Sequence, residues 1–411
     1  MKSRSLRLPP PLALIALTLL WSGCSGSGGP AFDAFNAYNL DGGAARACNF
    51  SDRKPGPAGM LRPFLYHNLH GGLLGPPLEL PLACFGFVTR SDAGSVLSVA
   101  RQDSLFWSFT APAGEYFMPG IAADSAGRIY AITTRGHLFA LTPEGTRLRD
   151  WQTQDCPGGL VLPSPLLALG SGTVLGNSNG EVMRYDAEGR LLWKVRRGAS
   201  ASDAMAADPH IGLAVPISHN SFDLADTLLL LDPATGSQRW AQSPGGRIVQ
   251  GPVIVGNLLM VGVVAQRDSL HQIPSLVAFT PEGKPAWRMP LLLTPRGIAG
   301  DNEGNIYVSG SGTGDEASGG ILESVDPTGR ERWQVTLKSG IPAAPAVSND
   351  WVFFISRRDG RTGLFTYGRD GHFQNFVAID VLPDVHARLT ISSLGELVLA
   401  ALDQPAIIVG R

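Results

Sequence analysis

A turn that recurs with an aromatic residue behind it constrains the fold of this 411-residue chain more than any other feature. The clearest copy is LLLLDPATGSQRW, residues 228–240, in which an apolar run leads into an Asp-Pro-x-x-Gly turn and a Trp follows the Gly by four residues. The aromatic residues that end the successive copies are Trp107, Trp151, Trp193, Trp240, Trp287, Trp333 and Phe376. They lie 42 to 47 residues apart and include six of the eight Trp in the chain. A fixed period of this length predicts an array of like structural units.

Each period also contains three short apolar runs upstream of its aromatic run, as in MPGIAADSAGRIYAITTRGHLFALTPEG, residues 118–145. Runs of four to six residues that are rich in β-branched and aromatic side chains and are broken by Gly, Asn and Asp are typical of strands. Pro-x-Gly turns favour hairpins in which the Gly adopts a left-handed conformation. The sequence therefore predicts an all-β fold with four antiparallel strands in each period.

Four strands in about 45 residues indicate the blade of a β-propeller, and the chain has room for eight blades. The last period, residues 387–411, contains only three runs. Since an unpaired sheet edge has to be covered, we expect a strand from the N-terminal region, at Leu61–His70, to complete the last blade. A seven-bladed propeller is the alternative, if the region before Cys84 does not form a blade.

The N-terminus has the pattern of an export signal. Lys2, Arg4 and Arg7 precede an apolar run at residues 11–20 that is too short to span a bilayer. The following WSGC resembles the lipidation site of bacterial lipoproteins, which implies that Cys24 carries the lipid.

This pattern divides the chain into three parts. Residues 1–23 are the expected signal peptide, residues 24–58 a flexible lipidated tether and N-terminal segment, and residues 59–411 the propeller. By the same resemblance, Ser25 implies delivery to the outer membrane, where the protein would face the periplasm or the cell surface.

The repeat resembles the quinoprotein (PQQ-type) propeller repeat, in which a Trp at this position docks one blade on the next. Over roughly residues 80–411 the chain is most similar to the BamB-like outer-membrane lipoproteins. This resemblance implies a non-catalytic scaffold for protein–protein interactions, in outer-membrane protein assembly or another envelope complex. It would be a monomeric propeller within a larger complex, would bind envelope proteins through one face, and would touch the membrane only through its lipid anchor.

The alternative function is that of a propeller enzyme, either a quinoprotein dehydrogenase or a metal-dependent hydrolase similar to lactonases. Quinoprotein dehydrogenases use a disulfide between adjacent Cys, and no two Cys are adjacent in this chain. His67 and His70 would lie on opposite faces of a strand, and the acidic turns at residues 123–130 and 300–308 lack the spacing of an EF-hand. We therefore expect no catalytic residue, no metal and no cofactor.

The net charge of −2 and the lack of a basic stripe argue against a nucleic-acid partner. After Cys24, three Cys remain, at positions 48, 84 and 156. Export permits disulfides, and we expect Cys48 to pair with Cys84.

Three insertions mark the expected interaction surface. They lie near Ser218, near Gln266 and at Gly310–Gly320, each between the second and third predicted strands of consecutive blades. Because equivalent loops of a propeller emerge on one face, and long loops carry binding surface, we expect partners to bind that face.

Overall fold

The computed structural model describes residues 49–50, 72–74, 77–80, 84–92, 94–101, 104–153, 164–219, 225–266, 272–311, 319–341, 343–379, 387–392, 395–401 and 407–410. All of them belong to one compact unit, Asp33–Arg411. The described residues form strands, turns and connections but no helix, so the predicted all-β class is confirmed for them. Within these ranges there is accordingly no helix of the length and apolar character that a membrane crossing needs.

The described strands form eight sheets that follow one another in the order of the chain. The first contains β2 (Gly72–Leu73), β3 (Leu78–Leu80), β4 (Cys84–Ser91), β5 (Gly94–Arg101) and β6 (Ser104–Thr110). The second contains β7 (Ala122–Ala123), β8 (Ile129–Ile132), β9 (His137–Leu141) and β10 (Arg147–Gln152). The third contains β11 (Leu167–Leu169), β12 (Gly172–Gly176), β13 (Glu181–Asp186) and β14 (Leu191–Arg196).

Like the second and third sheets, the next three sheets have four strands each. The fourth contains β15 (Ala206–Asp208), β16 (Gly212–Ile217), β17 (Thr227–Leu231) and β18 (Gln238–Gln242). The fifth contains β19 (Arg247–Val255), β20 (Leu258–Gln266), β21 (Gln272–Phe279) and β22 (Pro285–Pro290). The sixth contains β23 (Thr294–Gly300), β24 (Ile306–Ser311), β25 (Gly320–Val325) and β26 (Glu331–Leu337).

The last two sheets depart from four strands. The seventh contains β27 (Ala346–Ser348), β28 (Trp351–Arg358), β29 (Arg361–Gly368) and β30 (Phe373–Ala378), and β1 (Asn49–Phe50) pairs in parallel with β27. The repeat did not predict this fifth strand, which comes from the predicted N-terminal segment. The eighth contains β31 (Ala387–Ile391), β32 (Leu397–Ala401) and β33 (Ile407–Gly410), in keeping with the three runs of the last period.

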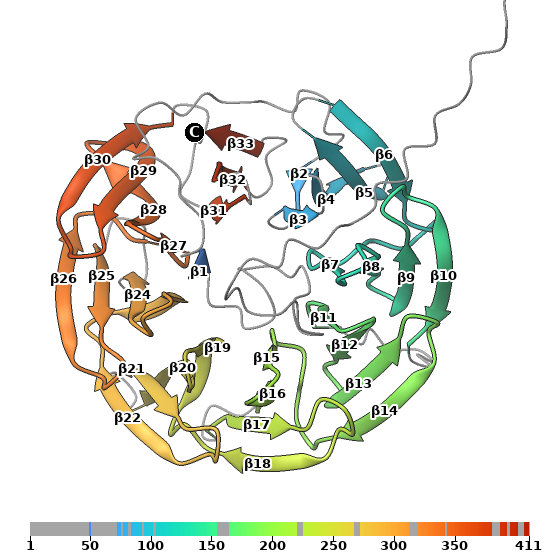
Figure 1. Cartoon of the computed structure of the whole chain (residues 1–411), viewed down its shortest axis with the longest axis horizontal. Coiled ribbons are helices and arrows are strands. Elements are labelled where there is room, and N and C mark those ends of the chain that lie inside the picture. The colour runs from blue at the N-terminus through green and yellow to red at the C-terminus, as the bar shows by residue number, and fades with distance from the viewer. Residues whose placement is uncertain are drawn as a thin grey trace, which may run out of the picture. The chain divides into compact units, whose positions relative to one another are not determined.

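The sheets succeed one another around a common centre, with the early strands of each sheet toward the centre and the last strand outermost (Figure 1). Contacts between neighbouring sheets include those of β15 with β19, β19 with β23, and β27 with β31. The core therefore lies between sheets, and a strand in the middle of a sheet is covered on both faces. In β17, Leu229 and Leu231 pack toward the third sheet, whereas Leu228 and Leu230 pack toward the fifth. This is why an unbroken Leu run replaces the usual alternation of apolar and polar residues.

The repeated turns have the predicted geometry. Gly236 has a φ of +72°, which an L-residue with a Cβ adopts only under strain. The register between β17 and β18 shifts at Leu230/Leu231, next to the turn. A left-handed Gly together with such a bulge is one of the common hairpin connections.

The predicted closing strand at Leu61–His70 lies outside the described residues. The last and first sheets nevertheless share a buried cluster, in which Val398 of β32 packs with Leu73, Phe85 and Phe87.

Candidate functional site

The repeated Trp residues lie on outermost strands and contact the repeated turn of the following sheet. The indole Nε1–H of Trp240 donates to the carbonyl of Pro281 at 2.8 Å. Its ring covers Gly283 so closely that a Cβ there would come within 2.7 Å of the ring. Equivalent hydrogen bonds join Trp107 to Pro143 (2.8 Å), Trp193 to Pro233 (3.0 Å), Trp287 to Pro327 (3.0 Å) and Trp333 to Arg369 (2.9 Å). Gly is thus required in the turn for two reasons: its φ is positive, and a larger residue would clash with the indole ring.

Two members of the aromatic series differ from this pattern. Trp151 covers Gly189 in the same way, but its buried Nε1 has no hydrogen-bond partner in the described part of the chain. Phe376 has no N–H to donate, and its ring lies 4.8 Å from that of Phe365 in its own sheet and 5.9 Å from the Arg358 guanidinium.

The acidic turn at residues 300–308 joins two sheets. The buried Asp301 carboxylate accepts hydrogen bonds from the backbone N–H groups of Glu303 and Asn305 and from the Tyr307 hydroxyl, at 2.9 Å each. Its Oδ2 also lies 2.6 Å from Nη2 of Arg369, which belongs to the seventh sheet. Burial raises the pKa of Tyr307, so the hydroxyl stays protonated and donates a hydrogen bond to the carboxylate.

The turn at residues 123–130 follows the same plan within its own sheet. Asp124 accepts from the Arg128 Nε at 2.7 Å and from the Tyr130 hydroxyl at 3.1 Å. The acids of both turns are therefore engaged in structural hydrogen bonds. Among the described residues, no group of three or more His, Cys, Asp or Glu side chains is arranged to hold a metal ion.

The three predicted insertions lie where the repeat predicts them. They connect β16 to β17, β20 to β21 and β24 to β25, the second and third strands of three consecutive sheets. Their central residues, 220–224, 267–271 and 312–318, are outside the described ranges. We use the term loop face for the ends of the sheets at which these connections leave.

Three large apolar side chains are exposed on the loop face of the fifth sheet and the connection that follows it. The exposed fractions are 38% for Val249, 41% for Ile273 and 74% for Leu292. The Leu291 N–H donates to the carbonyl of Pro274 at 2.9 Å, which extends the β21–β22 ladder by one step and brings Leu292 toward Ile273. The exposed apolar residues are thus gathered at one end of the sheet.

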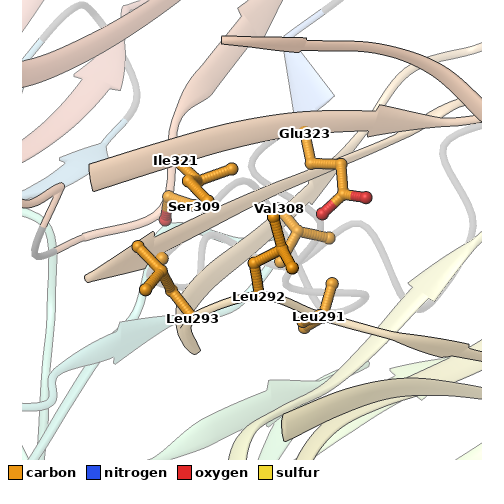
Figure 2. Close-up of a pocket in the computed structure, with 8 residues that line it drawn as sticks. Leu291, Leu292, Leu293, Val308, Ser309, Ile321 and Glu323 are labelled. Atoms are coloured by element: carbon orange, nitrogen blue, oxygen red, sulfur yellow. The ribbon is translucent and has the colours of Figure 1, made fainter. Parts of the chain in front are cut away.

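A small hollow with free space for about one water molecule lies beside Leu292 (Figure 2). Its apolar wall comes from Leu291, Leu292 and Leu293 on one side and from Val308 and Ile321, on β24 and β25, on the other. Sites for small molecules typically have roughly 300–1,000 Å³. The hollow is therefore far too small for a cofactor.

Glu323 supplies the charged group of this hollow. Its side chain is only 8% exposed, and Figure 2 shows its carboxyl group directed toward the hollow. Within the described part of the chain, no hydrogen bond or ion pair reaches that carboxyl group. Burial raises the pKa of Glu323 to about 7, and the negative charge of Glu331 adds to the shift.

Sequence reasoning missed Glu323, although a signal for it exists. Ile321, Glu323 and Val325 share one face of β25 because side chains alternate along a strand. The other two are buried and apolar. A carboxylate in the middle of such a face is the pattern that should have been singled out.

The other predicted site residues are only partly described. Cys84 is buried in β4, whereas Cys48, Cys156, Cys24, His67 and His70 lie outside the described residues. The Cys48–Cys84 pairing and the lipidation of Cys24 therefore stay predictions.

Comparisons with known proteins match two stretches of the chain to families. Residues 178–274 match the family described as outer membrane protein assembly factor BamB, and residues 292–316 match a β-propeller repeat. The structure of BamB from Moraxella catarrhalis is similar over 79% of this chain and 91% of its own, with 17% sequence identity and a TM-score of 0.53. At this identity the likeness concerns the fold. A comparison with curated proteins found no significant match.

Proposed function

The chain is a PQQ-like β-propeller that resembles BamB, and we propose that it is a non-catalytic scaffold of the bacterial cell envelope. In this proposal Cys24 anchors it to the outer membrane, and one protein molecule forms one propeller within a larger complex. The loop face binds another envelope protein, and outer-membrane protein assembly is the process that the family match favours.

We further propose that the eight sheets are eight blades of a closed ring. The cluster that Val398 forms with Leu73, Phe85 and Phe87 supports contact between the last and first blades. The N-terminal strand expected at Leu61–His70 would complete the last blade. The aromatic residues would dock each blade on the next, a role supported by the hydrogen bonds of Trp107, Trp193, Trp240, Trp287 and Trp333 to the following turn.

The observation that carries the scaffold proposal is the group of exposed apolar side chains Val249, Ile273 and Leu292. Their location beside the inserted loops joins two features that are typical of binding surfaces. Burying such side chains against a partner removes apolar area from water, which is the main favourable term in association. No feature of the described residues specifically favours the enzyme alternative.

Site-specific crosslinking tests this proposal. A photoreactive p-benzoylphenylalanine at Leu292 or at Ile273 should give discrete adducts with an envelope protein in intact cells. The control position is Leu192 of β14, which is 50% exposed on an outermost strand and should give none of these adducts. Equal adduct patterns at all three positions would show that the loop face is not a specific binding surface.

A further inference from the structure

We propose that the turn face of the first three sheets lies on an anionic phospholipid surface, into which Phe106, Leu148 and Leu192 insert. The turn face is the end of the sheets at which the repeated turns join the third strand to the fourth. This inference goes beyond the proposed scaffold function and rests on it only for the location of the protein at a membrane. It adds a membrane contact that is separate from the proposed lipid anchor.

The exposed apolar side chains of the described residues fall into two groups at opposite ends of the sheets. Successive connections of an antiparallel sheet leave at alternating ends, so the turn face lies opposite the loop face. Val249, Ile273 and Leu292 belong to the loop face. The other large apolar side chains that are exposed within the described ranges lie among the first three residues of an outermost strand, and hence at the turn face: Leu105, Phe106, Leu148, Leu191, Leu192 and Phe373.

Three consecutive sheets supply most of this second group. Their outermost strands β6, β10 and β14 follow one another along the outside of the sheets (Figure 1). The exposed fractions are 56% for Phe106, 46% for Leu148 and 50% for Leu192. A single exposed apolar residue is ordinary on a protein surface, whereas several that recur on neighbouring elements indicate a binding surface.

The repeat itself does not require apolar residues at these positions. The residue directly before the docking Trp is Phe106 in the first sheet and Leu192 in the third, but Arg239, Ala286 and Arg332 in the fourth, fifth and sixth. The Trp of each of these five sheets makes the same kind of hydrogen bond to the following turn. Docking between sheets therefore proceeds equally well with a polar or a small residue there, and it does not explain the exposed Phe and Leu.

Basic side chains accompany the apolar ones. The strands β10 and β14 carry a single acid, Asp150, against four basic residues: Arg147, Arg149, Lys194 and Arg196. Arg147 and Arg149 flank Leu148 and are exposed, and no ion pair within the described ranges engages Arg149. Binding to a membrane surface combines burial of apolar side chains at the headgroup boundary with the attraction of Lys and Arg to anionic lipid. The excess of positive charge therefore favours anionic phospholipid as the occupant of the turn face.

Contact at the turn face would orient the protein. A lipid anchor on a flexible segment holds a protein near a membrane but does not determine which side of it faces the lipid. With the turn face of the first three sheets on the lipid, the loop face points away from the membrane because it lies at the other end of the sheets. Ile273 and Leu292 then stay accessible to a partner.

Photocrosslinking on vesicles tests this inference. The full-length protein carries p-benzoylphenylalanine at Phe106 or at Leu192 and is bound to vesicles of phosphatidylethanolamine and phosphatidylglycerol. The control position is Ala286, which is exposed and directly precedes Trp287 as Leu192 precedes Trp193. The proposed anchor would hold the three proteins on the vesicles alike. Mass spectrometry should nevertheless find phospholipid on the Phe106 and Leu192 peptides in about fivefold higher yield, or more, than on the Ala286 peptide.

Removal of the basic residues tests the lipid charge. The double variant Arg147→Gln, Arg149→Gln should lower the lipid adduct at Phe106 roughly fivefold or more. Replacing phosphatidylglycerol with phosphatidylcholine should lower it as well. The matched control Lys284→Gln, Arg330→Gln removes two exposed basic residues from the turn face of the fifth and sixth sheets and should leave the adduct unchanged.

The outcomes separate this inference from the scaffold proposal. Equal lipid yields at Phe106, Leu192 and Ala286 would overturn the phospholipid contact. Adducts of Phe106 or Leu192 with another protein, or with a second copy of this chain, in envelope membranes would also overturn it, because a protein would then cover the turn face. Either result leaves the scaffold proposal standing, since that proposal depends on the protein adducts at Leu292 and Ile273. Absence of those adducts, in turn, would end the scaffold proposal without changing the lipid yield at Phe106.

Discussion

Nη2 of Arg369 lies 2.6 Å from Oδ2 of Asp301, and this ion pair joins the sixth sheet to the seventh. The carbonyl of the same Arg369 accepts the indole N–H of Trp333 at 2.9 Å. Arg369 therefore links the seventh sheet to the sixth through both its backbone carbonyl and its guanidinium group. The Asp301 side chain is fully buried and that of Arg369 is 15% exposed, so solvent screens this pair far less than a surface pair.

Arg369→Ala should therefore lower the free energy of unfolding by about 3–5 kcal/mol, because it leaves a buried carboxylate without its partner. Urea denaturation followed by Trp fluorescence measures the change. Arg190→Ala is the control: Arg190 pairs with Asp186, but its side chain is 75% exposed, and its loss should hardly change the unfolding midpoint. Equal effects of the two variants would contradict the inter-sheet role of Arg369.

Trp240→Ala should cost about 3–5 kcal/mol of stability, since it removes a large buried side chain from between two sheets. Trp240→Phe keeps most of the packing and loses the hydrogen bond to Pro281, so it should cost less, about 1 kcal/mol for the bond itself. Thermal unfolding should rank the variants in this order. Neither substitution should alter the yield of the Leu292 photoadduct at temperatures where the protein is folded.

Gly283→Ala should be destabilising although it adds only one methyl group. Gly283 has a φ of +80°, and the added Cβ would meet the Trp240 ring at 2.7 Å. Strain and overpacking of this kind typically cost about 1–3 kcal/mol. The double variant Gly283→Ala, Trp240→Ala should lose less than the sum of the two single variants, because the clash needs both side chains. Additive losses would contradict the direct contact.

Stability should fall as the pH rises through 7, because of Glu323. Its pKa is about 7 in the folded protein against an ordinary value of 4.5. The folded state thus binds more protons than the unfolded chain between these pH values. The stabilisation that comes from protonated Glu323 is therefore complete below pH 4.5 and is lost as the pH rises to about 7 and above. Between pH 5.5 and 8.5 the wild type should lose about 2 kcal/mol more than Glu323→Gln. Parallel pH profiles of the two proteins, measured by urea denaturation, would show that Glu323 ionises normally.

Leu292→Ser should separate binding from stability. Because the side chain is 74% exposed, the free energy of unfolding should change by no more than about 0.5 kcal/mol. Co-purification of the envelope protein that crosslinks at Ile273 should nevertheless fall several-fold, since an apolar contact at the mouth of the hollow is lost. If the Leu292→Ser protein retains its partner fully, Leu292 does not contribute to binding.

Several parts of the molecule could be predicted because they depend on local sequence. The turn at Asp232–Gly236 closes on its own residues, with Asp232 accepting hydrogen bonds from the backbone of Ala234 and Thr235. A Gly with positive φ is required there whatever the rest of the chain does. The same holds for the strand content of each period, and repetition made the pattern visible.

Glu323 and Arg369 could not be assigned in this way. In the sequence, Arg369 is an ordinary turn residue, and its partner Asp301 lies 68 positions earlier. Likewise, Glu323 is one charged residue in an apolar run, and Leu291–Leu293 is a connection between strands. Only the packing of the fifth sheet on the sixth brings these segments together and removes water from the carboxyl group.

By itself, the sequence determined the strand content, the repeated turns and the period, because hairpin geometry and the spacing of apolar residues act over a few neighbouring residues. The tertiary structure decided which acids are engaged in turns, which carboxyl group is left in an apolar hollow, and which apolar side chains stay in contact with water. These properties depend on desolvation by segments far apart in the chain, and desolvation exists only once the sheets have packed against one another.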